Sequence, residues 1–248
     1  MYSIDLNCDL GEGYPNDAQL MRLISSANIA CGAHAGDIET MRRTVSLAIE
    51  NGVAIGAHPG YADKNNFGRT SQRLSASQIH TLVSDQVSEL RRVCDEAGTH
   101  IRHVKPHGAL YNQAATDPEL AAAIAEAVAA IDKDLIFYGL SESRMLDAAA
   151  KAGLRTCAEV FADRTYQNDG TLTPRTRDDA LISDETQAVT QVLDMIRYKR
   201  VRTTDALMIP INAETVCLHG DGKHAISFAR LIRHAFEVNA ITIRSTFS

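Results

Sequence analysis

The chain has 248 residues, of which 45% are hydrophobic, and its formal net charge is -6. This length suits a single barrel-sized domain, and the negative charge argues against a nucleic-acid partner. No apolar run is long enough to cross a bilayer, and the first residues lack the basic and apolar regions of a signal peptide. The five cysteines show no Cys-x-x-Cys spacing, which indicates reduced core thiols. We therefore expect a cytoplasmic protein without a membrane partner.

Short apolar runs typical of β-strands alternate with helical patterns along the chain. Ile38, Met41 and Val45 keep helical spacing, and Gly52 provides a natural helix stop. Further helices are predicted to begin at the capping boxes of Ser75 and Thr116, at the candidate N-caps Ser141 and Ser183, and after Gly222. The predicted strands cover 4–10, 26–33, 54–58, 103–107, 135–139, 157–162 and 215–219.

The alternation of strand and helix predicts a mainly parallel sheet, which is either open and doubly wound or closed into a barrel. Polar residues end most of the predicted strands. An open sheet gathers ligands at a switch point, whereas a barrel gathers them from all its strand ends. We therefore predict a seven-stranded, TIM-like β/α barrel that forms a single domain over residues 1–248.

Two connections stand out from the alternation. The segment 163–181 is long, irregular and charged, and it follows a strand end, so we predict a mobile lid that orders when ligand binds. The segment 199–213 fits an extra hairpin.

The first strand carries three polar residues on one face. Asp5, Asn7 and Asp9 are spaced two apart, and a carboxylate that points into a barrel must be paired, hydrogen-bonded or metal-bound. Asp9 lies nearest the C-terminal end of the strand, so we expect it to meet substrate. The alternative is that Asp5 and Asn7 only satisfy polar groups below the site.

Histidines close several of the predicted strands. His34, His58, His107 and His219 each follow an apolar run. Imidazole can transfer protons near neutral pH or bind a metal through a neutral nitrogen. Asp9, His58 and His107 would form a suitable His/His/carboxylate metal site, although no HExxH or other local metal spacing is present.

A buried lysine and several loop arginines could bind an anion. Lys105 precedes His107 by two residues, and inside a barrel its charge needs an anionic ligand or a carboxylate partner, for which Glu159 and Asp163 are candidates. Guanidinium groups in strand-end loops could bind a carboxylate or phosphate, and the candidates are Arg69, Arg164 and Arg175. No GxSxG, GxGxxG or GxxxxGK[ST] motif is present, and the nearest approach to the last, 220–223, lacks its spacing.

These motifs together resemble the LamB/YcsF family of 5-oxoprolinase A subunits. The resemblance covers nearly the whole chain, in order, and rests on 5–12, 26–37, 56–61, 67–69, 104–112, 161–170 and 217–221. It implies a barrel like those of polysaccharide deacetylases and related glycoside hydrolases. It also implies hydrolysis of 5-oxo-L-proline to L-glutamate with ATP as co-substrate, together with partner subunits B and C.

Combining the residues with this resemblance gives a specific candidate site. The expected catalytic residues are Asp9, His58, Lys105 and His107. The expected substrate-binding residues are Asn7, His34, Arg69, Asp163, Arg164 and His219. A divalent metal is an open possibility. Two other functions stay open: a metal-dependent deacetylase or amidohydrolase, suggested by fold analogy alone, and a non-catalytic scaffold subunit.

Overall fold

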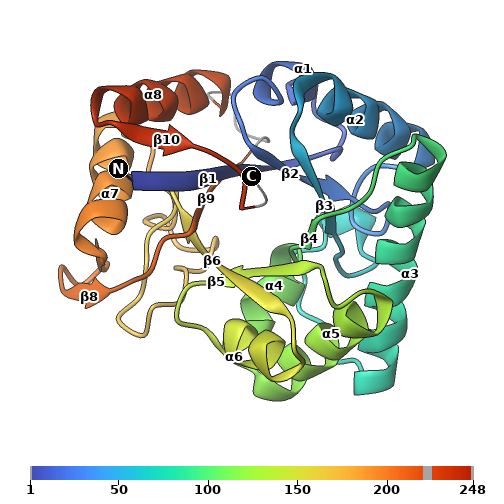
Figure 1. The fold of residues 1–248 in the computed structure, drawn as a ribbon. Coiled ribbons are helices and arrows are strands. Elements are labelled where there is room, and N and C mark those ends of the chain that lie inside the picture. The colour runs from blue at the N-terminus through green and yellow to red at the C-terminus, as the bar shows by residue number, and fades with distance from the viewer. Residues whose placement is uncertain (1, 220–224, 247–248) are drawn as a thin grey trace.

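The chain forms a closed barrel of seven parallel strands in the computed structural model, which describes residues 2–219 and 225–246 (Figure 1). The strands are β1 (Tyr2–Leu10), β2 (Ser26–Ala30), β3 (Ala54–His58), β4 (His103–Val104), β5 (Ile136–Leu140), β6 (Arg155–Phe161) and β9 (Thr215–His219). They pair in that order, and β1 also pairs with β9, which closes the ring. The predicted seven-stranded barrel is confirmed.

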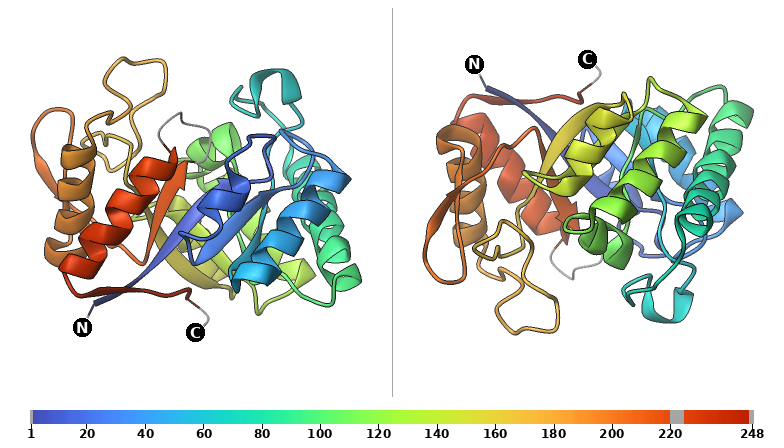
Figure 2. Two further views of the ribbon diagram at one scale, coloured as in Figure 1. Left: turned by 90° about the horizontal axis from the view of Figure 1, so that it is seen from above. Right: turned by 90° about the horizontal axis from the view of Figure 1, so that it is seen from below.

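Helices surround the barrel, as Figures 1 and 2 show. They are α1 (Asp17–Leu20), α2 (Ile38–Asn51), α3 (Ala76–Glu96), α4 (Gly108–Ala114), α5 (Pro118–Ile131), α6 (Arg144–Lys151), α7 (Glu185–Tyr198) and α8 (Ala225–Val238), with a short 3-10 helix η1 (Lys64–Asn66). The strands are buried almost throughout, as expected for a parallel sheet covered on both faces. Among the described residues, no helix is long and apolar enough to cross a membrane.

Local sequence signals explain where the earlier helices begin and end. The Asp37 side chain caps α2 by accepting from the backbone N–H of Thr40, and Gly52 ends the helix in a left-handed conformation with φ 65°. Ser75 and Gln78 form the predicted capping box at the start of α3. Both predictions are confirmed.

Three predicted N-caps lie slightly too early. Asp117 caps α5 in place of Thr116, since its carboxylate accepts from the backbone N–H groups of Glu119 and Leu120. The residue before α6 is Ser143, because the hydroxyl of Ser141 instead accepts a hydrogen bond from the Asn212 backbone at 2.9 Å. Asp184 caps α7 in place of Ser183, since its carboxylate accepts from two backbone N–H groups of the first turn. Start points predicted from residue type alone can therefore shift by one or two residues.

The fourth strand is shorter than predicted, and this shapes the site. Only His103 and Val104 form β4, whereas Lys105 and His107 lie beyond it. Their backbone N–H groups still donate to the carbonyl oxygens of Ala57 and Pro59, so the chain continues alongside β3 to the start of α4. Gly108, which follows His107, is the first residue of α4 and has a φ of 56°.

Two small additions complete the fold. The segment predicted as a hairpin forms β7 (Arg200–Arg202) paired antiparallel with β8 (Met208–Pro210), so that prediction is confirmed. A further strand, β10 (Ile241–Ile243), pairs with the first residues of β1 and was not predicted.

Long loops extend from one end of the barrel. Figure 2 shows the loops near residues 60–75 and 163–182 projecting from the end opposite the N-terminus. The second loop is more ordered than its composition predicts. Isolated bridges join Arg164 to Leu181 and Tyr166 to both Leu172 and Thr203. The base of this loop is therefore held in place, and only its tip, near 174–179, is continuously exposed.

Candidate active site

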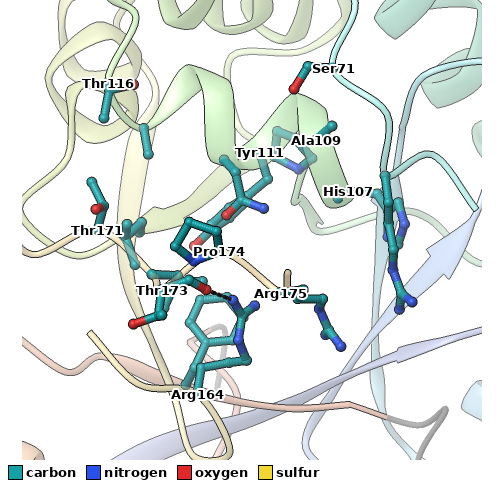
Figure 3. A pocket seen from close by; sticks show the side chains of 18 of the residues that line it. Ser71, His107, Ala109, Tyr111, Thr116, Arg164, Thr171, Thr173, Pro174 and Arg175 are labelled. Carbon is teal, nitrogen blue, oxygen red and sulfur yellow. Dashed lines mark hydrogen bonds between the residues drawn. The ribbon is translucent and has the colours of Figure 1, made fainter. Parts of the chain in front are cut away.

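A cavity of about 730 Å³ opens at the C-terminal ends of the strands. The four predicted catalytic residues, Asp9, His58, Lys105 and His107, all line it. Figure 3 shows that α4 contributes Ala109 and Tyr111, and that the loop after β6 contributes Arg164 and Arg175. The strand ends, α4 and one long loop therefore build a common pocket.

Lys105 occupies the floor of the cavity between two carboxylates. Its Nζ lies 2.8 Å from Asp9 Oδ1 and 2.9 Å from Glu159 Oε1, and all three side chains are at least 93% buried. It also contacts the Cys217 sulfur at 3.0 Å. Burial alone would lower the pKa of Lys105, but the neighbouring carboxylates outweigh this and raise it well above its ordinary value. The ion pair with Glu159, considered from the sequence, is present.

A layer of buried polar side chains supports this ion-pair cluster from below. The Asn7 amide donates to Glu159 at 2.9 Å and to Thr215 at 2.7 Å. The Asn28 amide donates to Asn7 Oδ1 and Asp9 Oδ1 at 2.7 and 2.8 Å. Asn7 is fully buried and does not line the cavity, so its predicted substrate contact is not supported. Its role here is to orient the carboxylates.

Asp5 lies at the bottom of this network. Its carboxylate accepts hydrogen bonds from the hydroxyls of Ser25, Ser26, Thr215 and Tyr138. Burial raises its pKa, and these hydrogen bonds partly offset the shift. The side chain thus satisfies polar groups below the site, which was one of the two alternatives for this residue.

Two histidines meet above the ion pairs. The Nδ1 of His58 lies 2.7 Å from the Lys105 carbonyl oxygen, and the Nε2 of His107 lies 2.9 Å from the Phe67 carbonyl oxygen. The remaining nitrogens, His58 Nε2 and His107 Nδ1, are 2.9 Å apart. Burial, then the neighbouring histidines, lower the pKa of His107 well below its ordinary value. His107 is therefore neutral at physiological pH.

His34 lies behind these rings. It is 1% exposed, does not line the cavity, and stacks on His107 with ring centroids 3.8 Å apart. Burial, then the neighbouring His58, lower its pKa to about 3. A direct contact between His34 and substrate is therefore not supported by its position.

Glu12 was missed as a site residue. It follows β1 by two positions, and the turn at Gly11, which has a φ of 72°, directs it back over the strand end. Its side chain is 4% exposed and lies 3.5 Å from His107 Nδ1. The sequence signal was the acidic residue directly after the strand-ending glycine.

Four residues of metal-binding types gather beside the cavity. Glu12, His34, His58 and His107 form a cluster whose ligand atoms lie within 4.8 Å of one another. Asp9 lies next to this cluster: its Oδ1 accepts from Lys105 and Asn28, and its Oδ2 lies 3.3 Å from His58 Nε2. The predicted metal set of Asp9, His58 and His107 shares its two histidines with the cluster and stays a prediction.

The three candidate arginines have different positions: Arg164 is held by the loop backbone, and Arg69 and Arg175 lie at the cavity rim. Arg164 lines the cavity, but its guanidinium donates to the Thr173 and Ala180 carbonyl oxygens, which fixes the loop (Figure 3). Burial, then the nearby Arg175, lower its pKa to about 10. Arg69 and Arg175 are exposed and line the cavity. Arg175 is therefore a better anion-binding candidate than Arg164.

The last two predicted substrate contacts, Asp163 and His219, differ in what the structure describes of them. Asp163 is half-buried at the start of the loop and is not a lining residue. The backbone of His219 pairs with Asp9 at the end of β9, but the side chain of His219 lies outside the described residues. The motif at 220–223 also lies outside them.

A closed seven-stranded β/α barrel with a polar pocket at its strand ends is the class of protein that these observations define. Residues 4–248 match the LamB/YcsF family, and the chain belongs to this family. It is 49% identical over 253 residues to the 5-oxoprolinase A subunit of Brevibacillus brevis, a match that covers 100% of both chains. The resemblance proposed from the sequence motifs is confirmed.

Solved structures place the fold in the same family and in a wider group. The lactam utilization protein from Thermus thermophilus is 38% identical with a TM-score of 0.91, and the match covers 98% of this chain and 99% of that one. The peptidoglycan deacetylase PdaC from Bacillus subtilis is 10% identical with a TM-score of 0.51 over 99% and 88% of the two chains. This second likeness shows a shared fold alone.

Proposed function

We propose that the protein is the A subunit of an ATP-dependent 5-oxoprolinase, which opens 5-oxo-L-proline to L-glutamate together with subunits B and C. The observation that carries the proposal is the full-length match to a relative named as the A subunit of 5-oxoprolinase. The name of the Thermus relative, a lactam utilization protein, agrees with it, since 5-oxoproline is a lactam.

The pocket suits a small anionic amide. 5-Oxoproline carries a carboxylate, and Arg69 and Arg175 offer guanidinium groups at the rim that can bind it. Below them, Lys105 supplies a fixed positive charge that can offset negative charge developing on the lactam oxygen. The arrangement therefore separates a site for the substrate carboxylate from a site for the reacting carbonyl.

The reaction needs activation of a stable amide and a positioned water. ATP supplies activation by transferring its γ-phosphoryl group to the lactam oxygen, which leaves ADP. Water then attacks the ring carbonyl carbon, the C–N bond breaks, and the ring nitrogen takes up a proton to become the amine, which leaves γ-glutamyl phosphate. A second water hydrolyses this acyl phosphate to glutamate and phosphate. Asp9 lines the cavity and can accept the proton from water, while Lys105 and Asn28 hold its Oδ1 in place.

ATP is expected to bind to the complete complex of subunits A, B and C. The sequence carries no phosphate-binding loop, so we propose that phosphoryl transfer requires subunits B and C and that this chain alone does not turn over. This division distinguishes the proposal from a metal-dependent deacetylase, which would act without ATP, and from a scaffold, which would contribute no chemistry.

A glutamate-release assay tests the proposal. The chain would be incubated with 5-oxoproline and ATP, alone and with B and C subunits from the same organism. Glutamate and ADP should form in equal amounts only in the complete mixture. Glutamate release by the complete mixture without ATP would overturn the proposal, and so would hydrolysis of an acetylated amide in preference to 5-oxoproline.

A further inference from the structure

Three ligand-type atoms converge where the histidines meet Glu12. The carbonyl oxygens of Lys105 and Phe67 can only accept hydrogen bonds, so His58 donates through Nδ1 and His107 donates through Nε2. In neutral imidazoles, the other nitrogens then carry lone pairs. These two nitrogens face each other at 2.9 Å, and each also lies near Glu12 Oε1. Acceptor atoms so close together repel one another unless something positive lies between them.

The separations among these atoms match a metal coordination site. His58 Nε2 lies 2.9 Å from His107 Nδ1, and Glu12 Oε1 lies 3.5 Å from His107 Nδ1 and 4.0 Å from His58 Nε2. One point inside a triangle with these sides is about 2.1 Å from all three corners, which is the bond length of zinc to histidine nitrogen and carboxylate oxygen. From this geometry we propose that Glu12, His58 and His107 bind one divalent transition-metal ion, with zinc as the best match.

The surrounding charges favour a cation at this point. Asp9 and Glu159 both contact Lys105, so two carboxylates share one ammonium group. Glu12 adds a third carboxylate beside the histidines, with its side chain 4% exposed and its Oε1 3.5 Å from His107 Nδ1. A divalent ion would offset this excess of buried negative charge, whereas a single proton shared by the two rings would offset only half as much.

His34 borders the site without completing it. Its ring is nearly parallel to that of His107, with planes at 5° and centroids 3.8 Å apart. A metal that lies in the plane of one stacked ring is displaced from the plane of the other, so both rings cannot bind it well in this arrangement. Neither ring nitrogen of His34 has a hydrogen-bond partner among the described residues. We assign His34 to the edge of the open coordination position, where it can contact a metal-bound water.

The hydrogen bonds on the far side of the two rings support the same assignment. In metal sites, the histidine nitrogen that does not bind the metal commonly donates to a backbone carbonyl or a carboxylate, which fixes the ring. Both His58 and His107 make that contact to backbone oxygens. Metal binding by these residues does not depend on which substrate the protein acts on. The metal site can therefore be tested independently of the 5-oxoprolinase proposal.

Metal binding can be measured on the full chain without any activity assay. The protein would be stripped with a chelator, and Zn²⁺ binding followed by competition titration and by elemental analysis after gel filtration. We expect about one zinc per chain and a higher melting temperature with zinc than without it. Co²⁺ should replace zinc and give the visible absorption of a low-symmetry nitrogen and oxygen site.

Variants at the three ligands provide the decisive comparison. Glu12→Gln, His58→Gln and His107→Gln should each weaken zinc binding at least about a hundredfold, while His34→Gln should have a smaller effect. His100→Gln removes an exposed histidine and serves as the matched control. Circular dichroism and metal-free melting curves show whether each variant is folded. The proposal is overturned if the wild-type chain binds no stoichiometric metal, or if folded ligand variants bind it as tightly as the control.

Discussion

Lys105 is the residue whose replacement should affect stability most directly. It joins Asp9 and Glu159 in the floor of the cavity, so Lys105→Met would leave two buried carboxylates without their shared cation. We expect a loss of about 3–5 kcal/mol in the free energy of unfolding, together with loss of turnover. A catalytic role alone would leave the fold nearly intact. Urea unfolding measures the difference, with Lys151→Met on the surface as the control. A change below about 1 kcal/mol would show that the carboxylates do not depend on Lys105.

His103 predicts how stability changes with pH. It is fully buried, its Nε2 is 2.8 Å from Asn28 Oδ1, and burial followed by the nearby Lys105 lowers its pKa to about 3. The unfolded chain takes up a proton near the ordinary value of about 6.5, so the neutral folded form loses stability as pH falls from there toward 3.

The matching variant isolates that histidine. In the wild type, the unfolding free energy should fall with decreasing pH partly because of His103. The His103→Gln variant should lose this part, so its slope between about pH 4 and 6 should be smaller by about 1.4 kcal/mol per pH unit. Urea titrations at several pH values supply both slopes. Parallel curves for the variant and the wild type would mean that His103 does not titrate on unfolding.

Some residues of the candidate site could be predicted from the sequence, and others could not. Asp9, Lys105 and His107 were predicted because side chains alternate along a strand, and because a buried charge must be paired, hydrogen-bonded or bound to a ligand. Glu12 was missed because it lies past the strand, where a glycine turn rather than periodicity sets its direction. The structural role of Arg164 could not be predicted, since backbone carbonyl oxygens that accept from an arginine leave no pattern in the sequence.

At the scale of elements, the start of α4 depends on a close approach between two loops. Gly108 has a φ of 56°, and a Cβ there would lie 2.7 Å from the backbone oxygen of Gly68. Gly98 also has a positive φ of 71°, but a Cβ at that position would meet nothing within 4 Å. A substitution at Gly98 therefore reports backbone strain alone, whereas the same substitution at Gly108 reports backbone strain and a steric clash together.

We expect Gly98→Ala to cost about 1–2 kcal/mol through strain alone, and Gly108→Ala to cost clearly more. The additional loss comes from moving the loop that holds Phe67, whose carbonyl accepts from His107. Chemical denaturation of both variants measures the difference. Equal losses would mean that the α4 start can shift away from Gly68 without cost.

The loop after β6 should behave as two parts. Its base is held by the buried Arg164 and Tyr166, whereas 174–179 is exposed. Hydrogen exchange should therefore be slow at the base and fast at the tip, and ligand should slow the tip selectively. Uniformly fast exchange across 163–181 would favour a fully mobile lid, and protection of the tip equal to the barrel strands without ligand would argue against any lid.

Elements were predicted well where a local signal sets them. The capping box at Ser75 and the glycine at Gly52 each mark a helix end with a specific backbone interaction. The length of β4 was overestimated because Lys105 and His107 keep ladder-like hydrogen bonds after regular strand pairing ends. Such an extension depends on the neighbouring strand, which a local pattern does not contain.

At the scale of the whole molecule, polar strand ends predicted the closed barrel. Residues from β1, β3 and the segment after β4 meet in one cavity because parallel strands place all their C-terminal ends at the same side. The pairing of β10 with the start of β1 could not be predicted in this way, since short terminal strands carry little periodicity. The approach of both Asp9 and Glu12 to His58 Nε2, at 3.3 and 4.0 Å, is likewise a product of three-dimensional packing.

In the proposed function, the pocket contributes chemistry to ATP-dependent hydrolysis of 5-oxoproline. The most direct test is the rate of ATP-dependent glutamate release by the assembled complex containing Asp9→Asn, compared with the exposed control Asp95→Asn. Assembly of each variant with subunits B and C would be checked by gel filtration. We predict that Asp9→Asn lowers the rate by about a hundredfold or more while the complex still forms, and that the control keeps the wild-type rate. An assembled Asp9→Asn complex that releases glutamate at the wild-type rate would contradict this claim.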